Sequence, residues 1–289
     1  MSAMLPPPRV REAFLAACRD ELRALKPGNV HIHAPGHGMQ VWHFERSAEA
    51  SAPHVADPGL AVGRRIRRAM EASFAIAGCN TNLGILLLAA PLARAADHPG
   101  LSGNGLRERL AAVLGALDLD DAAEAFAAIR LANPAGLGRV DVEDVTRPPS
   151  MTLMKAMQLA AGRDRISRAY ATDYEDVFVL GLGELRRARR IAATPELAVT
   201  TLHMALLAAF PDSHVARKHG PEAAAAMQSE AVALKDAWHP AATPLSVPRL
   251  LALDADLKRR GLNPGTTADL VVATLFADKL IAAAAPDCG

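Results

Sequence analysis

Three polar residues stand directly before a long apolar run, and their side chains can bind either a free amide or a ligand. Asn80, Thr81 and Asn82 are followed by Gly84 and by the apolar residues 85–93. Asn and Thr oxygens accept hydrogen bonds from the free N–H groups at the start of a helix, where the helix dipole places partial positive charge. The pattern predicts a buried helix whose polar start either binds phosphate or is a cap with no ligand.

A histidine-rich segment at residues 26–39 is the second place where chemistry could occur. It has no helical period, and its residues His31, His33 and His37 are followed by His43. Their spacing does not match a zinc signature, and no cysteine accompanies them. Because imidazole can donate, accept or shuttle a proton near neutral pH, we favour contacts with phosphate or a hydroxyl over a structural zinc site.

Two further polar segments interrupt the apolar parts of the chain. Residues 212–220 combine an acid, two histidines and two bases, and residues 263–269 offer amide, hydroxyl and carboxylate groups. Like residues 26–39 and 78–84, each lies beside an expected helix end. Cations and amides hold a polyphosphate, whereas carboxylates hold hydrated magnesium. The four segments together therefore predict one nucleotide site, provided that they converge in space.

The elements that must position these segments all have helical patterns. Apolar residues recur at helical spacing, as at Val10 and Phe14, and strand alternation of useful length is absent. The prediction is an all-α fold, a single globular bundle of roughly ten to thirteen helices in which residues 1–289 form one domain. Residues 133–150 contain three prolines and two glycines and are predicted to form a surface connection. The central apolar helix is expected to stop at Pro91 or soon after.

Composition limits the classes of function. Apolar residues make up 51% of the chain and aromatic residues only 4%, which favours helices packed closely on Ala and Leu. A net charge of +1 gives no drive toward nucleic acid or a membrane surface, and no apolar run reaches the roughly 20 residues of a membrane helix. Basic clusters at residues 64–68 and 186–190 are predicted to be solvated helix faces, with phosphate binding as the alternative. Three cysteines, an odd number, favour a reducing compartment, so we expect a cytoplasmic protein.

The polar motifs, taken in order, resemble the triphosphoribosyl-dephospho-CoA synthase family between about Glu21 and Leu280. Each motif is weak by itself, but the five in this order are fairly specific. They are Lys26-Pro27-Gly28, a histidine-containing loop that ends at Met39 and precedes Phe44-x-Arg46-Ser47-Ala48, then Gly78-x-Asn80-Thr81-x-x-Gly84, Asp212-Ser213-His214-x-Ala216-Arg217, and Asn263-Pro264-Gly265-x-x-Ala268-Asp269-Leu270.

The resemblance implies an all-helical enzyme that joins ATP to 3′-dephospho-CoA. In that reaction the 2′-hydroxyl of the dephospho-CoA ribose attacks C1′ of the ATP ribose, adenine leaves, and the triphosphate stays on the product. The product is the precursor of an acyl-carrier prosthetic group. The expected partners are a small-molecule nucleotide and dephospho-CoA, with no nucleic acid or membrane partner and with a homodimer as an option.

On this resemblance the candidate residues fall into three groups, defined by what the reaction needs. A base takes the hydroxyl proton, a carboxylate stabilises the oxocarbenium-like ribosyl centre, and cations and amides hold the phosphates. The expected catalytic residues are His31, His37, His214, Asp212 and Asp269. The expected ATP- or phosphate-binding residues are Lys26, Gly28, Asn29, Asn80, Thr81, Asn82, Gly84, Arg217 and Lys218. The expected magnesium ligands are Glu71, Asp212 and Asp269.

The chain departs from the family pattern at three places. The synthases carry His-Lys where this chain has Asn82-Leu83. They carry an Asp in the segment aligned with His31, and another acid where this chain has Gly38. A lost lysine and two lost acids change the charge of a phosphate–metal site. These departures indicate a separate branch, for which an alternative is a nucleotide- or phosphosugar-using step in the synthesis of a one-carbon carrier of the methanopterin or methanofuran type. A second alternative is a non-catalytic helical binding protein.

Overall fold

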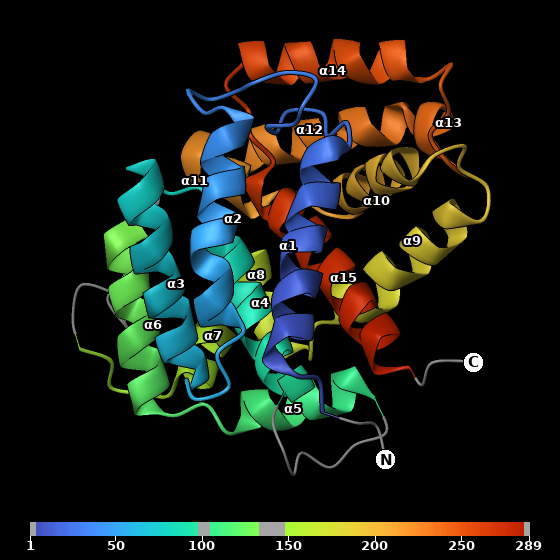
Figure 1. Cartoon of the computed structure of the whole chain (residues 1–289). Coiled ribbons are helices and arrows are strands. Elements are labelled where there is room, and N and C mark those ends of the chain that lie inside the picture. Colours follow the sequence, from blue (N-terminus) through green and yellow to red (C-terminus); the bar gives the residue numbers. More distant parts are fainter. Residues whose placement is uncertain (1–3, 98–104, 133–147, 286–289) are drawn as a thin grey trace. The chain divides into compact units, whose positions relative to one another are not determined.

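The computed structural model describes residues 4–97, 105–132 and 148–285. Over these residues the chain is all-α, as predicted, with no strand and only two isolated β-bridges, His31 to Ala34 and Gly36 to Met39 (Figure 1). The α-helices are α1 (Pro7–Arg23), α2 (Val41–Val55), α3 (Val62–Ala77), α4 (Leu83–Asp97), α5 (Leu106–Gly115), α6 (Leu119–Ala132), α7 (Leu153–Ala160), α8 (Arg165–Ala171), α9 (Leu182–Arg189), α10 (Pro195–Ala209), α11 (Ser213–His219), α12 (Pro221–Ala233), α13 (Lys235–Trp238), α14 (Val247–Arg259) and α15 (Gly265–Ala284). A π-helical turn, η1 (Asp176–Gly181), precedes α9.

The number of helices in the described residues exceeds the expected ten to thirteen because short elements add to the long ones. α13, for example, has only four residues and directly follows α12. Most of the predicted surface connection at 133–150 lies outside the described residues. No helix among those described is both long and apolar enough to cross a bilayer.

The chain divides into two compact units. Unit 1 contains residues 1–17, 43–175 and 276–289, and unit 2 contains residues 18–42 and 176–275. Each unit has its own polar cluster and its own packed helices, and each is described by itself below. One domain over residues 1–289 stays a prediction.

Helix α4 forms the core of unit 1. It contacts α3, α5, α6 and α8, and α3 in turn packs along α6 (Figure 1). All of its side chains except those at Gly84 and Arg94 are buried. The apolar run therefore forms the buried helix that the sequence predicts, and this helix begins at Leu83, directly after the polar turn.

Helix α4 continues through Pro91 to Asp97, beyond the stop that was expected at Pro91 or soon after. Proline has no N–H, which would leave the carbonyl four residues earlier, at Leu87, without its helical partner. The hydroxyl of Tyr170 donates to that carbonyl at 2.6 Å, and Tyr174 donates to Leu88 O at 3.2 Å. Two buried tyrosines thus supply donors to the helix backbone around the proline, and the helix persists.

One arginine of the basic cluster at residues 64–68 is completely buried, which corrects the prediction of a solvated face for that residue. Arg65 pairs with Asp97 through two contacts of 2.9 and 3.1 Å. It also donates to the carbonyls of Leu60 and Val55, each at 2.9 Å. This cation therefore joins the start of α3 to the end of α4 inside unit 1.

Unit 2 is built around α10. This helix packs on α9, α12 and α13, while α11 packs on α12 and α13 contacts α14. Its apolar core includes Met204 from α10, Trp238 from α13 and Leu257 from α14. The polar loops that follow α1 and precede α15 both belong to this unit, so their mutual geometry is defined.

Candidate functional site

Lys26 lies in the loop that follows α1, within unit 2, and is completely buried. Its ammonium group pairs with the buried carboxylate of Glu21 and donates to Asn29 Oδ1 at 2.9 Å. Burial lowers the pKa of Lys26 and raises that of Glu21, while the attraction between the two opposes both shifts. The negative charge of Asp269 also favours the charged form of Lys26. Lys26 therefore holds the loop together internally, and its contact with phosphate stays a prediction.

Asp254 on α14 makes several contacts that hold the same loop in place. Its Oδ1 accepts the backbone N–H of Gly28 at 2.9 Å and lies 3.3 Å from His31 Nε2, while its Oδ2 accepts from Lys258 Nζ at 3.0 Å. Lys258 also donates to Ala34 O at 3.2 Å. Burial by itself opposes ionisation of Asp254, but its contacts with His31, Lys258 and Gly28 outweigh this and hold its pKa below the usual value. One carboxylate thus fixes the backbone at Gly28 and the side chain of His31 in a distant segment, together with Lys258 of its own helix.

The loop after α1 is joined directly to the loop before α15. Asn29 Nδ2 donates to Asn263 Oδ1 at 2.8 Å. Gly28 has a φ of +86°, and a Cβ at that position would lie 2.8 Å from Pro264 Cδ, so both the backbone conformation and the close approach require glycine. Two of the four predicted segments therefore do lie together.

Asp212 links the third segment to the same region. Its Oδ1 accepts the N–H groups of His214 and Val215 at 2.8 and 3.1 Å, and its Oδ2 accepts the N–H and hydroxyl of Thr267 at 2.7 and 2.8 Å. Burial raises the pKa of Asp212 despite these four hydrogen bonds. The side chain thus caps α11 and holds the first turn of α15, while its predicted catalytic and metal-binding roles stay predictions.

Two of the predicted catalytic histidines lie beside these contacts and are held in their neutral form. His37 Nε2 bonds to Gly28 O at 2.8 Å, and a Cβ at Gly265 would lie 3.4 Å from the His214 ring. Burial, followed by the charges of Arg217 and Lys218, lowers the pKa of His214 to about 4. Burial also lowers the pKa of His37. The cations that act on His214 provide positive charge where an anionic ligand is expected.

The predicted turn at Asn80, Thr81 and Asn82 belongs to unit 1. Asn80 Oδ1 accepts the N–H of Leu83 at 3.1 Å and so caps α4 as the sequence indicates. Thr81 Oγ1 donates to Ser47 Oγ at 2.8 Å, and Asn82 Nδ2 donates to Ser73 Oγ at 2.9 Å. Phosphate binding by these residues and Gly84, and their convergence with the three loops of unit 2, stay predictions.

Comparison with protein families decides the membership of this chain. Residues 7–287 match the model of the ATP:dephospho-CoA triphosphoribosyl transferase family. The chain belongs to this family. A crystal structure from Archaeoglobus fulgidus, of a protein proposed to be a triphosphoribosyl-dephospho-CoA synthase, shares the fold with a TM-score of 0.61 and 23% identity, covering 80% of this chain and 95% of that one. A comparison with proteins of curated function finds no match.

Membership of the transferase family confirms the resemblance that the motifs predicted, but the motifs omit several residues of the site. Glu21, Asp254, Lys258 and the completely buried His203 were not predicted. A signal for Asp254 was present, because this acid occurs within the buried stripe of α14 beside Leu253 and Leu257. A charged residue in an apolar stripe needs a partner and therefore marks a polar cluster.

The remaining predicted metal ligand, Glu71, lies on α3 in unit 1. It accepts from Arg67 at 2.9 Å and lies 3.8 Å from Arg68. Among the residues with described structure, no three His, Cys, Asp or Glu side chains are grouped so as to hold a metal ion. Magnesium binding by Glu71, Asp212 and Asp269 stays a prediction.

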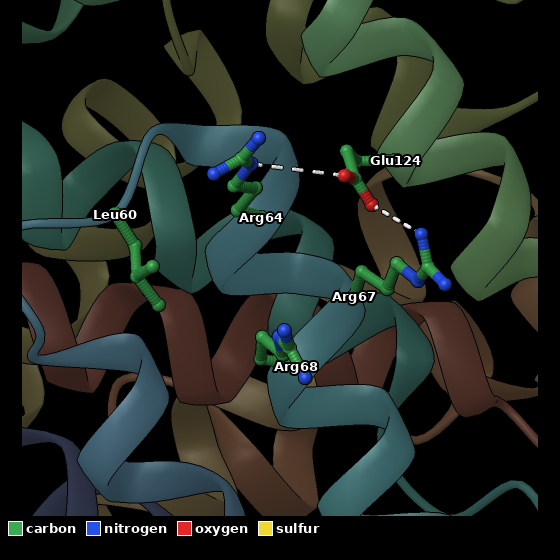
Figure 2. Close-up of a pocket in the computed structure, with 5 residues that line it drawn as sticks. All are labelled: Leu60, Arg64, Arg67, Arg68 and Glu124. Atoms are coloured by element: carbon green, nitrogen blue, oxygen red, sulfur yellow. Dashed lines mark hydrogen bonds and ion pairs between the residues drawn. The ribbon is translucent and has the colours of Figure 1, made fainter.

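A surface pocket of about 270 Å³ lies over α3 and α6 in unit 1 (Figure 2). It is lined by Leu60, three arginines and Glu124, which binds Arg67 at 2.9 Å and lies 3.7 Å from Arg64. The side chain of Arg64 is 68% exposed. These arginines form the solvated helix face that the sequence predicts, with Arg65 as the buried exception.

Proposed function

We propose that this chain transfers the triphosphoribosyl group of ATP to the 2′-hydroxyl of 3′-dephospho-CoA, with release of adenine. The observation that carries this proposal is the family match over residues 7–287. The linked loops of unit 2 support it, because they provide cations, neutral imidazoles and amides in one polar cluster. A triphosphate needs the cations, and the displacement needs a proton acceptor.

The residues best placed to bind the triphosphate lie at the basic C-terminal end of α11. Arg217 and Lys218 follow His214, and their positive charges contribute to the lowered pKa of its ring. Lys218 is exposed and Arg217 is half-buried, so both differ from Lys26, whose ammonium group is enclosed by Glu21 and Asn29. We assign phosphate binding first to the α11 pair and to Lys26 only if its loop rearranges.

Magnesium enters this proposal as part of the Mg–ATP substrate. Asp212 uses both carboxylate oxygens in hydrogen bonds within unit 2, and Glu71 pairs with arginines of its own helix. Mg²⁺ commonly keeps several waters and is bound largely by substrate phosphates, so a dedicated protein cage is not required.

A second candidate exists for the acceptor substrate, and it can be tested. At the position where the synthases carry His-Lys, this chain has Asn82 bonded to Ser73, followed by the buried Leu83. A charged pair of residues is therefore replaced by a neutral one, which changes the charge available to a phosphorylated substrate. This favours, as the alternative, another phosphorylated acceptor in the synthesis of a one-carbon carrier cofactor.

The direct experiment is to incubate the chain with ATP, Mg²⁺ and 3′-dephospho-CoA and to measure free adenine. We expect adenine and a coupled product with dephospho-CoA, and neither when CoA, which carries a 3′-phosphate, replaces it. Adenine release only with a pterin or phosphosugar acceptor would favour the alternative. Intact ATP with every acceptor would contradict the proposal.

A matched pair of variants tests the phosphate assignment. Lys218→Ala removes a cation from the α11 end, whereas Lys235→Ala removes an exposed cation from α13. Because a hydrogen bond to a charged group contributes about 1.5–3 kcal/mol, Lys218→Ala should raise the KM for ATP roughly tenfold or more, and Lys235→Ala should leave it unchanged. Equal effects of the two variants would count against this phosphate site.

We also place the enzyme in the cytoplasm, because neither Cys18 nor Cys79 is in a disulfide. A homodimer remains an option that sedimentation of the purified chain would test.

A further inference from the structure

The imidazole of His31 has one nitrogen engaged and one nitrogen without a partner. Its Nε2 lies 3.3 Å from Asp254 Oδ1 and 3.4 Å from Lys258 Nζ. Its Nδ1 is buried and has no hydrogen-bond partner among the residues that the structure describes. The side chain as a whole is completely buried. A buried polar nitrogen without a partner is costly in a native structure and therefore needs an explanation.

The neighbours of Nε2 decide which nitrogen carries the proton. Lys258 already donates to Asp254 Oδ2 at 3.0 Å and to Ala34 O at 3.2 Å, both shorter than its distance to His31. The carboxylate of Asp254 beside Nε2 favours a proton on that nitrogen, because a lone pair facing a carboxylate would be repelled. In this tautomer Nδ1 is an acceptor with a free lone pair.

We propose that His31 Nδ1 is the base that takes the proton from the attacking hydroxyl, and that Asp254 is the positioning residue that fixes the ring and its tautomer. The proposal rests on the transfer reaction proposed above and names its base. It extends the arrangement in which a carboxylate orients an imidazole that activates a hydroxyl.

The step balances without any further reactant. The O–H bond of the 2′-hydroxyl breaks and its proton moves to His31 Nδ1, while the oxygen forms a bond to C1′ of the ATP ribose. The bond between C1′ and adenine breaks, and its electron pair leaves with adenine. Adenine then takes up one proton, directly or through water, so that the base is restored.

The other two candidate histidines are less suited to this role. His37 Nε2 bonds to a backbone carbonyl, Gly28 O, and not to a carboxylate, and burial followed by the adjacent cations of α11 lowers the pKa of His214 to about 4. His31 is also held neutral, because burial lowers its pKa, but Asp254 opposes this shift and stabilises the imidazolium formed when the proton arrives. The charged groups that act on it are Asp254 and Lys258 from α14 and Lys26 from its own loop. His203 on α10 and His33 on its own loop are further titratable groups nearby, since the pKa of His203 is affected by His31 and the ring of His33 lies 5.6 Å away.

One neighbour of the buried ring is a surface side chain. The ring of His33 lies 5.6 Å from that of His31, tilted by 53°, and His33 itself is exposed. The buried His31 ring therefore lies beside a side chain that reaches the surface.

The first test compares the pH dependence of adenine release in three variants and the unmodified chain. His31→Gln should lower kcat about 100-fold or more and change the KM for ATP less than threefold. Asp254→Asn should lower kcat about tenfold or more and move the acidic limb of the profile to lower pH by about one unit or more, because the imidazolium loses its carboxylate. His54→Gln, the same change in unit 1, should leave both quantities unaltered.

The outcomes separate this proposal from the function on which it rests. No adenine release by the unmodified chain would overturn the function and the base role together. Release that survives in a folded His31→Gln variant within threefold would overturn the base role alone. If His31→Gln does not fold, an acidic limb that stays in place in Asp254→Asn overturns the proposal. Nitrogen NMR of the unmodified chain gives a test that needs no variant, since a proton on His31 Nδ1 at neutral pH would contradict it.

Discussion

Asp97 in unit 1 and Asp254 in unit 2 are both buried acids held by cations, yet their surroundings differ. Asp97 faces the guanidinium of Arg65, whose remaining donors reach backbone carbonyls. Asp254 faces Lys258, a backbone amide and His31. The first pair consists of permanent charges in fixed geometry, whereas the second includes a titratable ring with a free nitrogen.

This difference separates a structural ion pair from a reactive one. A bidentate arginine–carboxylate pair is strongly directional, and its members keep their charges throughout the pH range of life. An imidazole beside a carboxylate can gain and lose a proton at little cost. Perturbing unit 1 at Arg65 should therefore change stability, and perturbing unit 2 at Asp254 should change catalysis.

The largest expected effect is on the structural pair. Arg65→Ala removes the cation that pairs with Asp97 in a completely buried setting. Breaking such a pair typically costs about 3–5 kcal/mol, so the free energy of unfolding should fall by that amount. Chemical denaturation measures the loss, and hydrogen exchange should place it in α3 and α4.

The neighbouring Arg64→Ala is the matched control for this prediction. Its side chain is 68% exposed, and exposed ion pairs contribute about 0–1 kcal/mol. A loss of stability in Arg64→Ala as large as that in Arg65→Ala would show that the two positions do not differ as their burial requires. The interpretation of Asp97 and Arg65 as a structural ion pair would then be contradicted.

Acid should weaken unit 2 through its buried histidines. Burial, followed by the charge of Lys26, lowers the pKa of His203 to about 3. Between the unfolded value of about 6.5 and this folded value, the unfolded chain binds a proton that the folded chain does not, so stability falls as the pH falls. His203 alone should remove about 2 kcal/mol between pH 7 and pH 5.

Unfolding measured at a series of pH values checks this expectation. Over that window the free energy of unfolding should change with pH less steeply in His203→Gln than in the unmodified chain, by about 1 kcal/mol per pH unit on average. Hydrogen exchange at pH 5 should show opening first in α10 and the loop after α1. An unchanged slope in His203→Gln would show that this ring takes up its proton in the folded chain.

The sequence was sufficient to predict the elements but not the contacts between distant residues. Asn80 precedes an apolar run at cap spacing, and it does cap α4. Asp254, by contrast, acts on Gly28, which lies 226 positions away in the chain. No local sequence pattern predicts the contact between Asp254 and Gly28. An acid in the apolar stripe of α14 does indicate that some buried partner must exist.

The helix through Pro91 shows the same limit for a local rule. Proline ends helices because a carbonyl loses its donor and the ring crowds the preceding turn. In unit 1 the missing donor comes from Tyr170, which is distant in sequence and adjacent in space. A rule based on local structure failed because a tertiary contact removed the cost on which the rule depends.

Removing that donor should have a moderate effect on stability. Tyr170→Phe deletes only the hydroxyl and leaves Leu87 O at the proline without it, inside a buried environment. An unsatisfied buried acceptor costs about 1–3 kcal/mol, so denaturation should show a loss in that range. Phe178→Tyr, which adds a hydroxyl in unit 2, is the control for the substitution chemistry, and it should not alter exchange in α4. A loss below about 0.5 kcal/mol in Tyr170→Phe would contradict this account of Pro91.

The smallest expected effect on stability comes from the turn whose role is still undecided, and it tests whether unit 1 contributes to the nucleotide site. Asn80→Ala removes the cap on Leu83 N and should cost about 1 kcal/mol. Asn80→Asp keeps the cap and adds a negative charge that the start of α4 favours, so its stability should be retained or rise slightly.

If the turn holds the triphosphate, that same charge repels it, and we expect the KM for ATP to rise about tenfold or more in Asn80→Asp. Isothermal titration with ATP, alongside thermal unfolding, separates the two quantities. Undiminished ATP affinity in a fully stable Asn80→Asp variant would leave the turn as a helix cap and confine nucleotide binding to unit 2.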